Sequence, residues 1–199
     1  MLSALIFLFQ IFVTKIIISY TMSIHESYFI KKGILHMTKT NYSDKDCRET
    51  AERLLSAASR APKDSCLHLF DKTLLDFSIP EQWMDFQFVV GENHLNVIGT
   101  VHGGVMAGIA DECMGFGAAS LLGLEDEVVT TSDMRFNCMK AIYLGDVLRV
   151  HIILRHAGKR SLITTAEIYR GEDLVFMATE NLFRLPKGKV TPDSAIYHI

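Results

Sequence analysis

The sequence predicts an α+β domain in which one buried helix is covered by an antiparallel sheet. The helix is expected within residues 96–119, NVIGTVHGGVMAGIADECMGFGAA, because the apolar residues after His102 cover nearly the whole helical circumference. From residue 128 to residue 185 the pattern changes to the two-residue period of strands, and turn sequences separate the segments. One helix inside one curved antiparallel sheet is the simplest arrangement that buries both patterns.

Size and composition indicate a single globular domain. The chain has 199 residues, of which 49% are hydrophobic and 22% charged, and its net charge is -3. The Lys and Arg residues are dispersed, which argues against a nucleic-acid partner. Cys47, Cys66, Cys113 and Cys138 show no C-x-x-C spacing, so we expect free thiols in a reducing compartment and a cytoplasmic protein.

Residues 1–36 form an apolar extension that begins MLSALIFLFQIFVTKIIISY and contains Lys15. No basic residue precedes the apolar run and no small-residue cleavage site follows it, so a secretory signal is disfavoured. Two interpretations stay open. Residues 1–20 are a signal anchor, which would be the only membrane contact, or the extension is spurious and translation starts at Met37 or Met22. We favour the spurious extension, because nothing after Met37 is typical of a secreted or membrane-bound protein.

The segment 37–84 is predicted to lie at the periphery of the main domain. Its first part, over residues 43–58, has the pattern of a solvated amphipathic helix that begins near Asp44 or Ser43, with Pro62 beyond its end. A loop with a short turn of helix is expected over 65–83, where the apolar residues have no clean period.

The main domain is predicted over residues 85–186, and the tail over 187–199 is predicted to fray. A strand over 84–90 should lead into the loop at Asn96. Four strands joined by short turns should then follow the helix as an antiparallel meander, at 128–138, 147–156, 162–169 and 174–185. In the first of these, the face predicted to pack on the helix contains Val128, Thr130, Ser132, Met134, Phe136 and Cys138, which leaves Thr131 on the polar face.

One face of the predicted helix combines glycines with a carboxylate. At about 100° per residue, Gly104, Gly108, Asp111 and Gly115 fall within roughly 60° of one another, whereas Glu112 is about 100° from Asp111. Glycines lower helix propensity, so this face should admit a second backbone or a thin ligand. A carboxylate in such a groove requires a partner or a function, and Asp111 is therefore a candidate catalytic residue; a structural Asp that caps a neighbouring loop is the alternative.

The Asn-x-x-Gly-Thr-x-His-Gly-Gly pattern that precedes this helix, with Asp111 inside it, resembles the PaaI-type branch of the hotdog-fold acyl-CoA thioesterases, within the 4-hydroxybenzoyl-CoA thioesterase superfamily. The resemblance covers about residues 86–185. It implies a hotdog fold, a homodimer that pairs into a homotetramer, an acyl-CoA or aryl-CoA substrate, and Asp111 as the catalytic carboxylate. It implies no cofactor, because coenzyme A is part of the substrate. Many relatives have a proline where this chain reads Met139-Lys140-Ala141.

The start of the helix is predicted to form an oxyanion hole. The first N–H groups of a helix have no intrahelical partner, so Gly103, with Gly104 beside it, could polarise a thioester carbonyl, and Asn96 is a candidate second donor. The alternative is a tight turn in which glycine only permits a positive φ. The resemblance gives Thr131 the role of orienting the attacking water or carboxylate, and gives His102 a positioning role.

The spacing of Gly103 and Asp111 predicts a site shared by two subunits. Eight residues at about 1.5 Å each separate them by about 12 Å, too far for both to act on one carbonyl. Two antiparallel helices packed side by side would bring the carboxylate of one subunit to the amino end of the other, in agreement with the resemblance. Whether Asp111 acts as general base or as nucleophile stays open.

The turn that contains Gly158, Lys159 and Arg160 resembles a basic turn near the coenzyme A phosphates in relatives, although two such residues in a hairpin are usually solvated. The histidines lack H-x-x-x-H or comparable spacing, so no metal site is predicted. The predicted function is hydrolysis of an acyl-CoA to free acid and coenzyme A. The alternative is a non-catalytic acyl-CoA-binding protein with a sensing or regulatory role.

Overall fold

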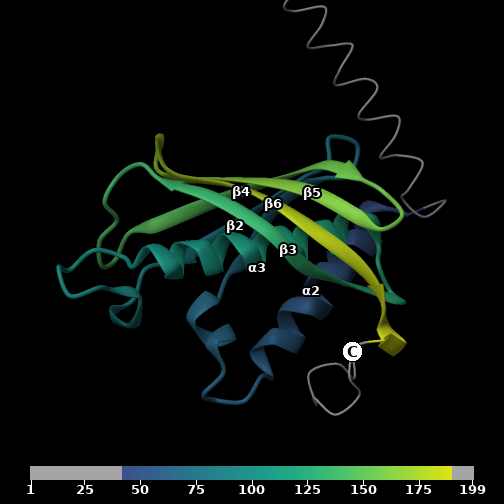
Figure 1. The fold of residues 1–199 in the computed structure, drawn as a ribbon, viewed down its shortest axis with the longest axis horizontal. Coiled ribbons are helices and arrows are strands. Elements are labelled where there is room, and N and C mark those ends of the chain that lie inside the picture. The colour runs from purple at the N-terminus through teal and green to yellow at the C-terminus, as the bar shows by residue number, and fades with distance from the viewer. Residues whose placement is uncertain (1–41, 190–199) are drawn as a thin grey trace, which may run out of the picture.

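A computed structural model of the chain describes residues 42–189, so the predictions for residues 1–36 and for most of the tail lie outside the described residues. A six-stranded antiparallel sheet curves over the long helix α3, and the shorter helix α2 lies beneath α3 (Figure 1). In chain order the elements are α2 (Asp44–Ser59), the 3-10 helix η1 (Cys66–Phe70), β1 (Thr73–Ser78), β2 (Trp83–Val89), η2 (Glu92–His94), α3 (Gly103–Leu122), β3 (Glu127–Cys138), β4 (Val147–Ala157), β5 (Ser161–Arg170), β6 (Asp173–Pro186) and η3 (Lys187–Lys189).

The strand order in the sheet is β1-β2-β4-β5-β6-β3. The bounds of α2, β2 and the four strands after α3 are confirmed to within about a residue, whereas α3 ends at Leu122, three residues beyond the segment in which the helix was expected. The four-strand meander is wrong. Of the four strands after α3, β4, β5 and β6 pair in sequence, whereas β3 pairs with β6, as in Val128 opposite Leu185. The reason is that α3 crosses the concave face of the sheet and returns the chain to the edge opposite β1 and β2 (Figure 1).

The loop expected over 65–83 is partly a strand. Its first part is the short helix η1, as predicted, but β1 follows and pairs antiparallel with β2. A register shift between Leu74 and Asp76 interrupts this pairing. Inward-facing and outward-facing residues therefore do not alternate regularly along β1, and the sequence shows no two-residue period there. The sheet therefore begins at Thr73, inside the segment that was predicted to be peripheral.

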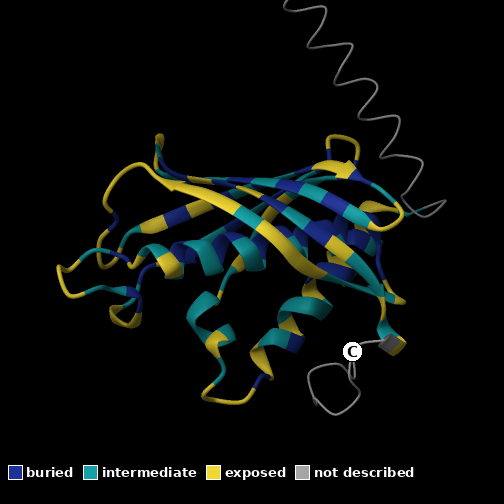
Figure 2. Ribbon diagram, viewed as in Figure 1, coloured by how far each residue is buried: buried dark blue, intermediate teal, exposed yellow. Residues whose placement is uncertain are grey.

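Helix α3 is the centre of the core. Fully buried residues along it, such as Ile109, Cys113 and Leu121, pack with the inner face of the sheet (Figure 2). A side chain at Gly117 would meet Ile152 of β4 at 2.4 Å, so glycine there sets the close approach of helix and sheet. The helix ends at Gly123, whose φ of 62° is left-handed. α3 is long and apolar enough to span a membrane, but most of it is buried within the domain.

Helix α2 is the amphipathic helix that was predicted. It begins where predicted, and the structure adds a capping box in which the Ser43 Oγ accepts from the Asp46 N–H and the Asp46 carboxylate accepts from the Ser43 N–H. One side of it is buried on the rest of the domain through Cys47 and Ala51. The opposite side of the helix is exposed or partly exposed, as expected of an amphipathic helix.

The inward face of β3 changes along the strand. In its pairing with β6, Thr131 lies opposite Leu182 and Asp133 lies opposite Asn181, so Ser132 is an extra residue that forms a β-bulge. Before the bulge Val129 and Thr131 face α3, and after it Met134 does. The predicted inward face is therefore correct only after Ser132. The bulge turns Thr131 toward the helix.

Candidate active site

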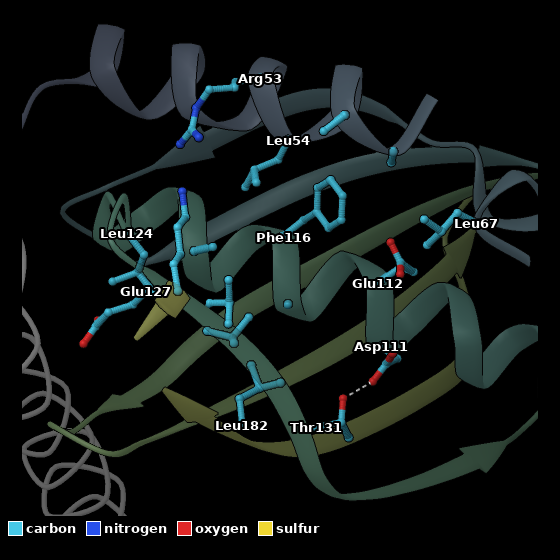
Figure 3. Close-up of a pocket in the computed structure, with 17 residues that line it drawn as sticks. Arg53, Leu54, Leu67, Asp111, Glu112, Phe116, Leu124, Glu127, Thr131 and Leu182 are labelled. Carbon is cyan, nitrogen blue, oxygen red and sulfur yellow. Dashed lines mark hydrogen bonds between the residues drawn. The ribbon is translucent and has the colours of Figure 1, made fainter. Parts of the chain in front are cut away.

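Asp111 and Thr131 meet, as the site prediction requires. Asp111 lies on the partly exposed side of α3, and its Oδ1 accepts a hydrogen bond from the Thr131 Oγ1 at 2.5 Å (Figure 3). Thr131 is also 2.7 Å from Oε1 of Glu180, a fully buried residue of β6. Burial, together with the neighbouring carboxylate of Asp111, raises the pKa of Glu180 to about 9. The side chain of Asp111 is thus held by a hydroxyl with a second carboxyl group behind it.

Glu112 has different surroundings. Its Oε2 accepts from the Lys72 Nζ at 3.1 Å, and the Lys72 side chain is only 3% exposed. The same ammonium group lies 4.1 Å from the centre of the Phe116 ring. Glu112 is therefore half of a buried ion pair that attaches the loop before β1 to α3. This separation of roles agrees with the helical wheel, which placed only Asp111 on the glycine face.

A cavity of about 280 Å³ opens beside Asp111, between α2, α3 and β3 (Figure 3). Asp111, Glu112 and Thr131 form one end, and Arg53 and Glu127 lie toward the other. The walls between them are largely apolar and include Leu54, Leu67, Phe116, Leu124, Val129 and Leu182. The cavity can hold an apolar group whose polar end reaches the carboxylate.

The amino end of α3 has one donor in use and one available. His102 is the N-cap, and its Nδ1 accepts from the Gly104 N–H at 2.9 Å. The Gly103 N–H forms no hydrogen bond within residues 42–189. Gly103 lines a separate cavity of about 350 Å³, together with Cys138, and does not line the cavity of Asp111. His102 thus holds the loop, and the two halves of the predicted site open into different cavities of one chain.

Asn96 organises the loop before α3. Its Oδ1 accepts from the Ile98 and Thr100 N–H groups at 3.0 and 3.2 Å, and its Nδ2 donates to the Thr100 Oγ1 at 2.9 Å. These bonds fold residues 96–100 into a tight turn. One Nδ2 hydrogen remains for the predicted role as a second donor. His94 supports the same loop, because its backbone carbonyl accepts from the His102 N–H at 2.9 Å.

The glycine face of α3 does not stay open along its length. A side chain at Gly108 would meet the Phe70 ring of η1 at 2.4 Å, so the approach that Gly108 permits is used by this chain itself. At Gly115 the neighbour is Val129 of β3, at an ordinary 3.7 Å. The expected approach of a second helix is therefore wrong at Gly108, because the packing of η1 on this face leaves no mark in the sequence. Gly115 lines the cavity beside Asp111, so the expectation of a thin ligand at this glycine stays a prediction.

The basic turn and the thiols lie apart from Asp111 and its cavity. Lys159 and Arg160 are exposed, and neither forms an ion pair with a described residue. Gly158 accepts from Arg184 through its carbonyl oxygen, which fixes the turn to β6. Burial raises the pKa of the Cys113 thiol to about 12, so it is unreactive. In the described part of the chain, no group of three His, Cys, Asp or Glu side chains is arranged to hold a metal ion.

Two residues of the site were missed from the sequence, Glu180 and Lys72. Glu180 stands in the strand sequence LVFMATENLF, where a lone acidic residue among apolar neighbours was a usable signal. Inside a strand it has to face either solvent or the core, and only the strand register decides which. Lys72 had no such signal, because a lysine next to an aspartate in a loop is ordinarily solvated.

A helix buried under a curved antiparallel sheet, with a carboxylate on the helix beside an apolar cavity, defines a hotdog-fold protein, and solved structures support this class. The Escherichia coli PaaI protein of the phenylacetic acid degradation operon aligns with a TM-score of 0.57 and 19% identity, over 69% of this chain and 94% of that one. The Streptococcus mutans protein smu.793, solved bound to acetyl-CoA, aligns with a TM-score of 0.52 and 21% identity, over 58% and 89%. At these identities the likeness shows the fold.

The chain belongs to the thioesterase superfamily. The family model described as Thioesterase superfamily matches residues 98–177, which include α3 and β3. A protein of Pseudomonas aeruginosa named "Putative esterase PA0474" is 32% identical over 97 residues, which are 49% of this chain and 71% of that protein. The family and fold that the loop and helix pattern predicted are confirmed. Glu180 lies just beyond the matched residues.

Proposed function

We propose that this protein hydrolyses acyl-CoA thioesters to a free acid and coenzyme A, at a site shared by two subunits. The observation that carries the proposal is the position of Asp111, a carboxylate held by Thr131 at the polar end of an apolar cavity. Membership of the thioesterase superfamily supports thioester hydrolysis. The acetyl-CoA in the Streptococcus mutans structure supports coenzyme A as the carrier of the acyl group.

The cavity suits the acyl part of such a substrate. Its volume of about 280 Å³ is near the lower limit of ordinary ligand pockets, so it fits one acyl or aryl group and not a whole coenzyme A. The apolar walls would stabilise the acyl chain by removing it from water. The thioester carbon would then lie at the end occupied by Asp111, and the coenzyme A moiety would extend out of the cavity.

The separation of Asp111 from Gly103 supports a shared site. The two residues line different cavities, so an acyl group beside Asp111 would receive its oxyanion donor from Gly103 of the partner subunit. β3 supports self-association because it is an edge strand of 12 residues, so one of its two sides pairs with no strand of the described chain. The strand also contains Phe136, an aromatic residue that is 44% exposed. A long open edge strand is a template for pairing with a second copy. The open amino end of α3, rather than Gly108 and Gly115, would face the partner.

The reaction follows from these groups. Asp111 either removes a proton from water as the water adds to the thioester carbonyl, or attacks the carbonyl itself to give an anhydride that water then opens. The oxyanion would accept from the Gly103 N–H of the partner subunit, and removal of one such donor typically costs about 3 kcal/mol of transition-state stabilisation. The carbon–sulfur bond breaks, and the thiolate leaves and takes a proton. Water is the only co-reactant.

The test is turnover on a panel of acyl-CoAs that differ in chain length and in aromatic content, with a thiol reagent to detect free coenzyme A. We expect catalytic release of thiol with at least one short or aryl acyl group. Chains too long for the cavity should react more slowly. Binding of acyl-CoA by calorimetry without release of thiol would contradict hydrolysis and favour the acyl-CoA-binding alternative.

A further inference from the structure

Two carboxyl groups share one hydroxyl group in this site. The Thr131 Oγ1 lies 2.5 Å from the Asp111 Oδ1 and 2.7 Å from the Glu180 Oε1. A hydroxyl group has one hydrogen, so it can donate to only one of the two oxygens. The other short contact requires a hydrogen from its carboxyl group. One of the two carboxyl groups is therefore protonated when both contacts are made.

Burial places this proton on Glu180. The Glu180 side chain is 0% exposed, whereas Asp111 is partly exposed at the wall of the cavity. An ionised group loses more by leaving water than a neutral one, so the more deeply buried carboxyl group keeps the proton. The raised pKa of Glu180, about 9, agrees with this assignment.

The neighbours of Glu180 do not compensate a negative charge. From α3 it faces Asp111 and Glu112, both of which oppose its ionisation, and Lys72 is already engaged with Glu112. From β3 it faces Thr131, and its cross-strand partner on β5 is the neutral, buried Thr164. Within residues 42–189 no Lys, Arg or His forms an ion pair with Glu180, and its Oε2 has no hydrogen-bond partner.

We propose that Glu180 is a positioning residue that acts through Thr131, holding a proton so that the Thr131 hydroxyl is directed at Asp111. The Glu180 Oε1–H donates to the Thr131 Oγ1, and the Thr131 O–H donates to the Asp111 Oδ1. The Asp111 carboxylate is then held in one orientation, with Oδ2 available to water or to the thioester. This role rests on the proposed function, since it serves the attack by Asp111.

The two hydrogen bonds from Glu180 to Thr131 and from Thr131 to Asp111 can form together only while Glu180 is protonated. Below the pKa of Glu180 the two donors point in one direction, from Glu180 to Asp111. Above it the hydroxyl of Thr131 faces two carboxylates and can satisfy only one, so Asp111 loses its orienting bond in part of the molecules. The kcat should therefore fall as the pH rises through about 9.

A pair of substitutions separates this role from simple packing. Glu180→Gln keeps the shape and donates to Thr131 at every pH, so kcat at pH 7 should stay within about twofold and the alkaline fall should disappear. Glu180→Leu fills the site without a donor, so kcat should fall about tenfold, the size expected for loss of one orienting hydrogen bond. Adding Thr131→Val to Glu180→Leu should cause less further loss than Thr131→Val alone, because both act along one path. Circular dichroism and gel filtration would establish that each variant folds.

Carbon-13 NMR of labelled glutamate carboxyl groups tests the proton directly and needs no turnover. The resonance that is missing in Glu180→Gln should titrate far above the ordinary Glu value of about 4.3. Titration of that resonance near 4.3, or a Gln variant as impaired as the Leu variant, would overturn the proposal. A high titration in a protein that hydrolyses no acyl-CoA would instead refute the proposed function and leave the proton on Glu180.

Discussion

Asp111 and Glu112 are neighbours on α3 with opposite surroundings. Glu112 is paired with a buried ammonium group, Lys72, and within residues 42–189 no cation forms an ion pair with Asp111, which accepts from the hydroxyl of Thr131. The difference arises because consecutive residues of a helix point about 100° apart, one toward η1 and β1 and the other toward β3 and β6. A carboxylate held by a cation stabilises the fold, whereas one held by neutral donors stays available as a base or nucleophile.

The largest effect expected is on Asp111. Asp111→Asn keeps the volume and can accept from Thr131, but it has neither basicity nor negative charge, so kcat should fall by about 10³. The matched control is Glu112→Gln, for which kcat should stay within a few fold. Steady-state kinetics on a responsive acyl-CoA measures both. Equal losses in the two variants would contradict the separation of roles.

A heterodimer of two variant subunits tests whether Asp111 acts with Asn96 and Gly103 of the other subunit. If each site takes Asn96 and Gly103 from one subunit and Asp111 from the other, a heterodimer of Asp111→Asn and Asn96→Ala has one doubly damaged site and one intact site. Such a dimer should recover up to about half of the wild-type activity. Differently tagged subunits, coexpressed and purified through both tags, give the dimer to be assayed. Activity no higher than that of the parent variants would place the whole site within one chain.

The ion pair of Glu112 should matter for stability. Lys72→Met would leave the Glu112 carboxylate without its cation in a buried setting, and we expect a loss of about 3 kcal/mol in the free energy of unfolding. Adding Glu112→Leu should restore much of this loss, because no charge is then left unpaired. Urea denaturation measures each variant. A Lys72→Met protein as stable as the wild type would show that the pair contributes no net stability.

The proton on Glu180 should appear in the pH dependence of stability. The folded chain keeps this proton to a pH of about 9, the folded pKa, and an unfolded Glu keeps it only to about 4.3. The stability that Glu180 contributes is thus fully present below about pH 4 and is lost as the pH rises toward 9, by at most about 1.4 kcal/mol per pH unit. Glu180→Gln should remove this loss. The free energy of unfolding of the variant, measured by urea denaturation, should therefore rise relative to that of the wild type as the pH increases from about 4 to about 9. A pH-independent difference would argue against a buried protonated Glu180.

The smallest effect is expected at the basic turn of Lys159 and Arg160, which contacts neither Asp111 nor Glu112. Replacement of Lys159 and Arg160 by Ala should raise the KM for acyl-CoA a few fold and leave kcat nearly unchanged, as loss of uniform binding does. The increase should shrink at high salt, because exposed charges are screened. Lys45→Ala on α2, where the charge is also exposed, is the control. An unchanged KM at every salt concentration would remove the turn from the site.

Much of the molecule followed from local sequence. The all-round apolar pattern indicated that α3 is a buried helix, Ser43 or Asp44 marked the start of α2, and the helical wheel separated Asp111 from Glu112. Each of these depends on contacts within a few residues or on the geometry of one helix. The bounds of β2 and of the strands after α3 were predictable for the same reason, because a regular period marks both ends of an element.

Tertiary structure decided what surrounds Asp111. The bulge at Ser132 reversed the inward face of β3 and brought Thr131 to the helix, and Phe70 filled the groove at Gly108. The pairing of β3 with β6 placed Glu180 behind Thr131, 49 residues further along the chain. A one-residue change of register reverses every side chain of a strand, and neither register nor strand order leaves a mark in the local period. The sequence could therefore name the carboxylate, but only the packing of α3 against β3 and β6 determined which groups hold it.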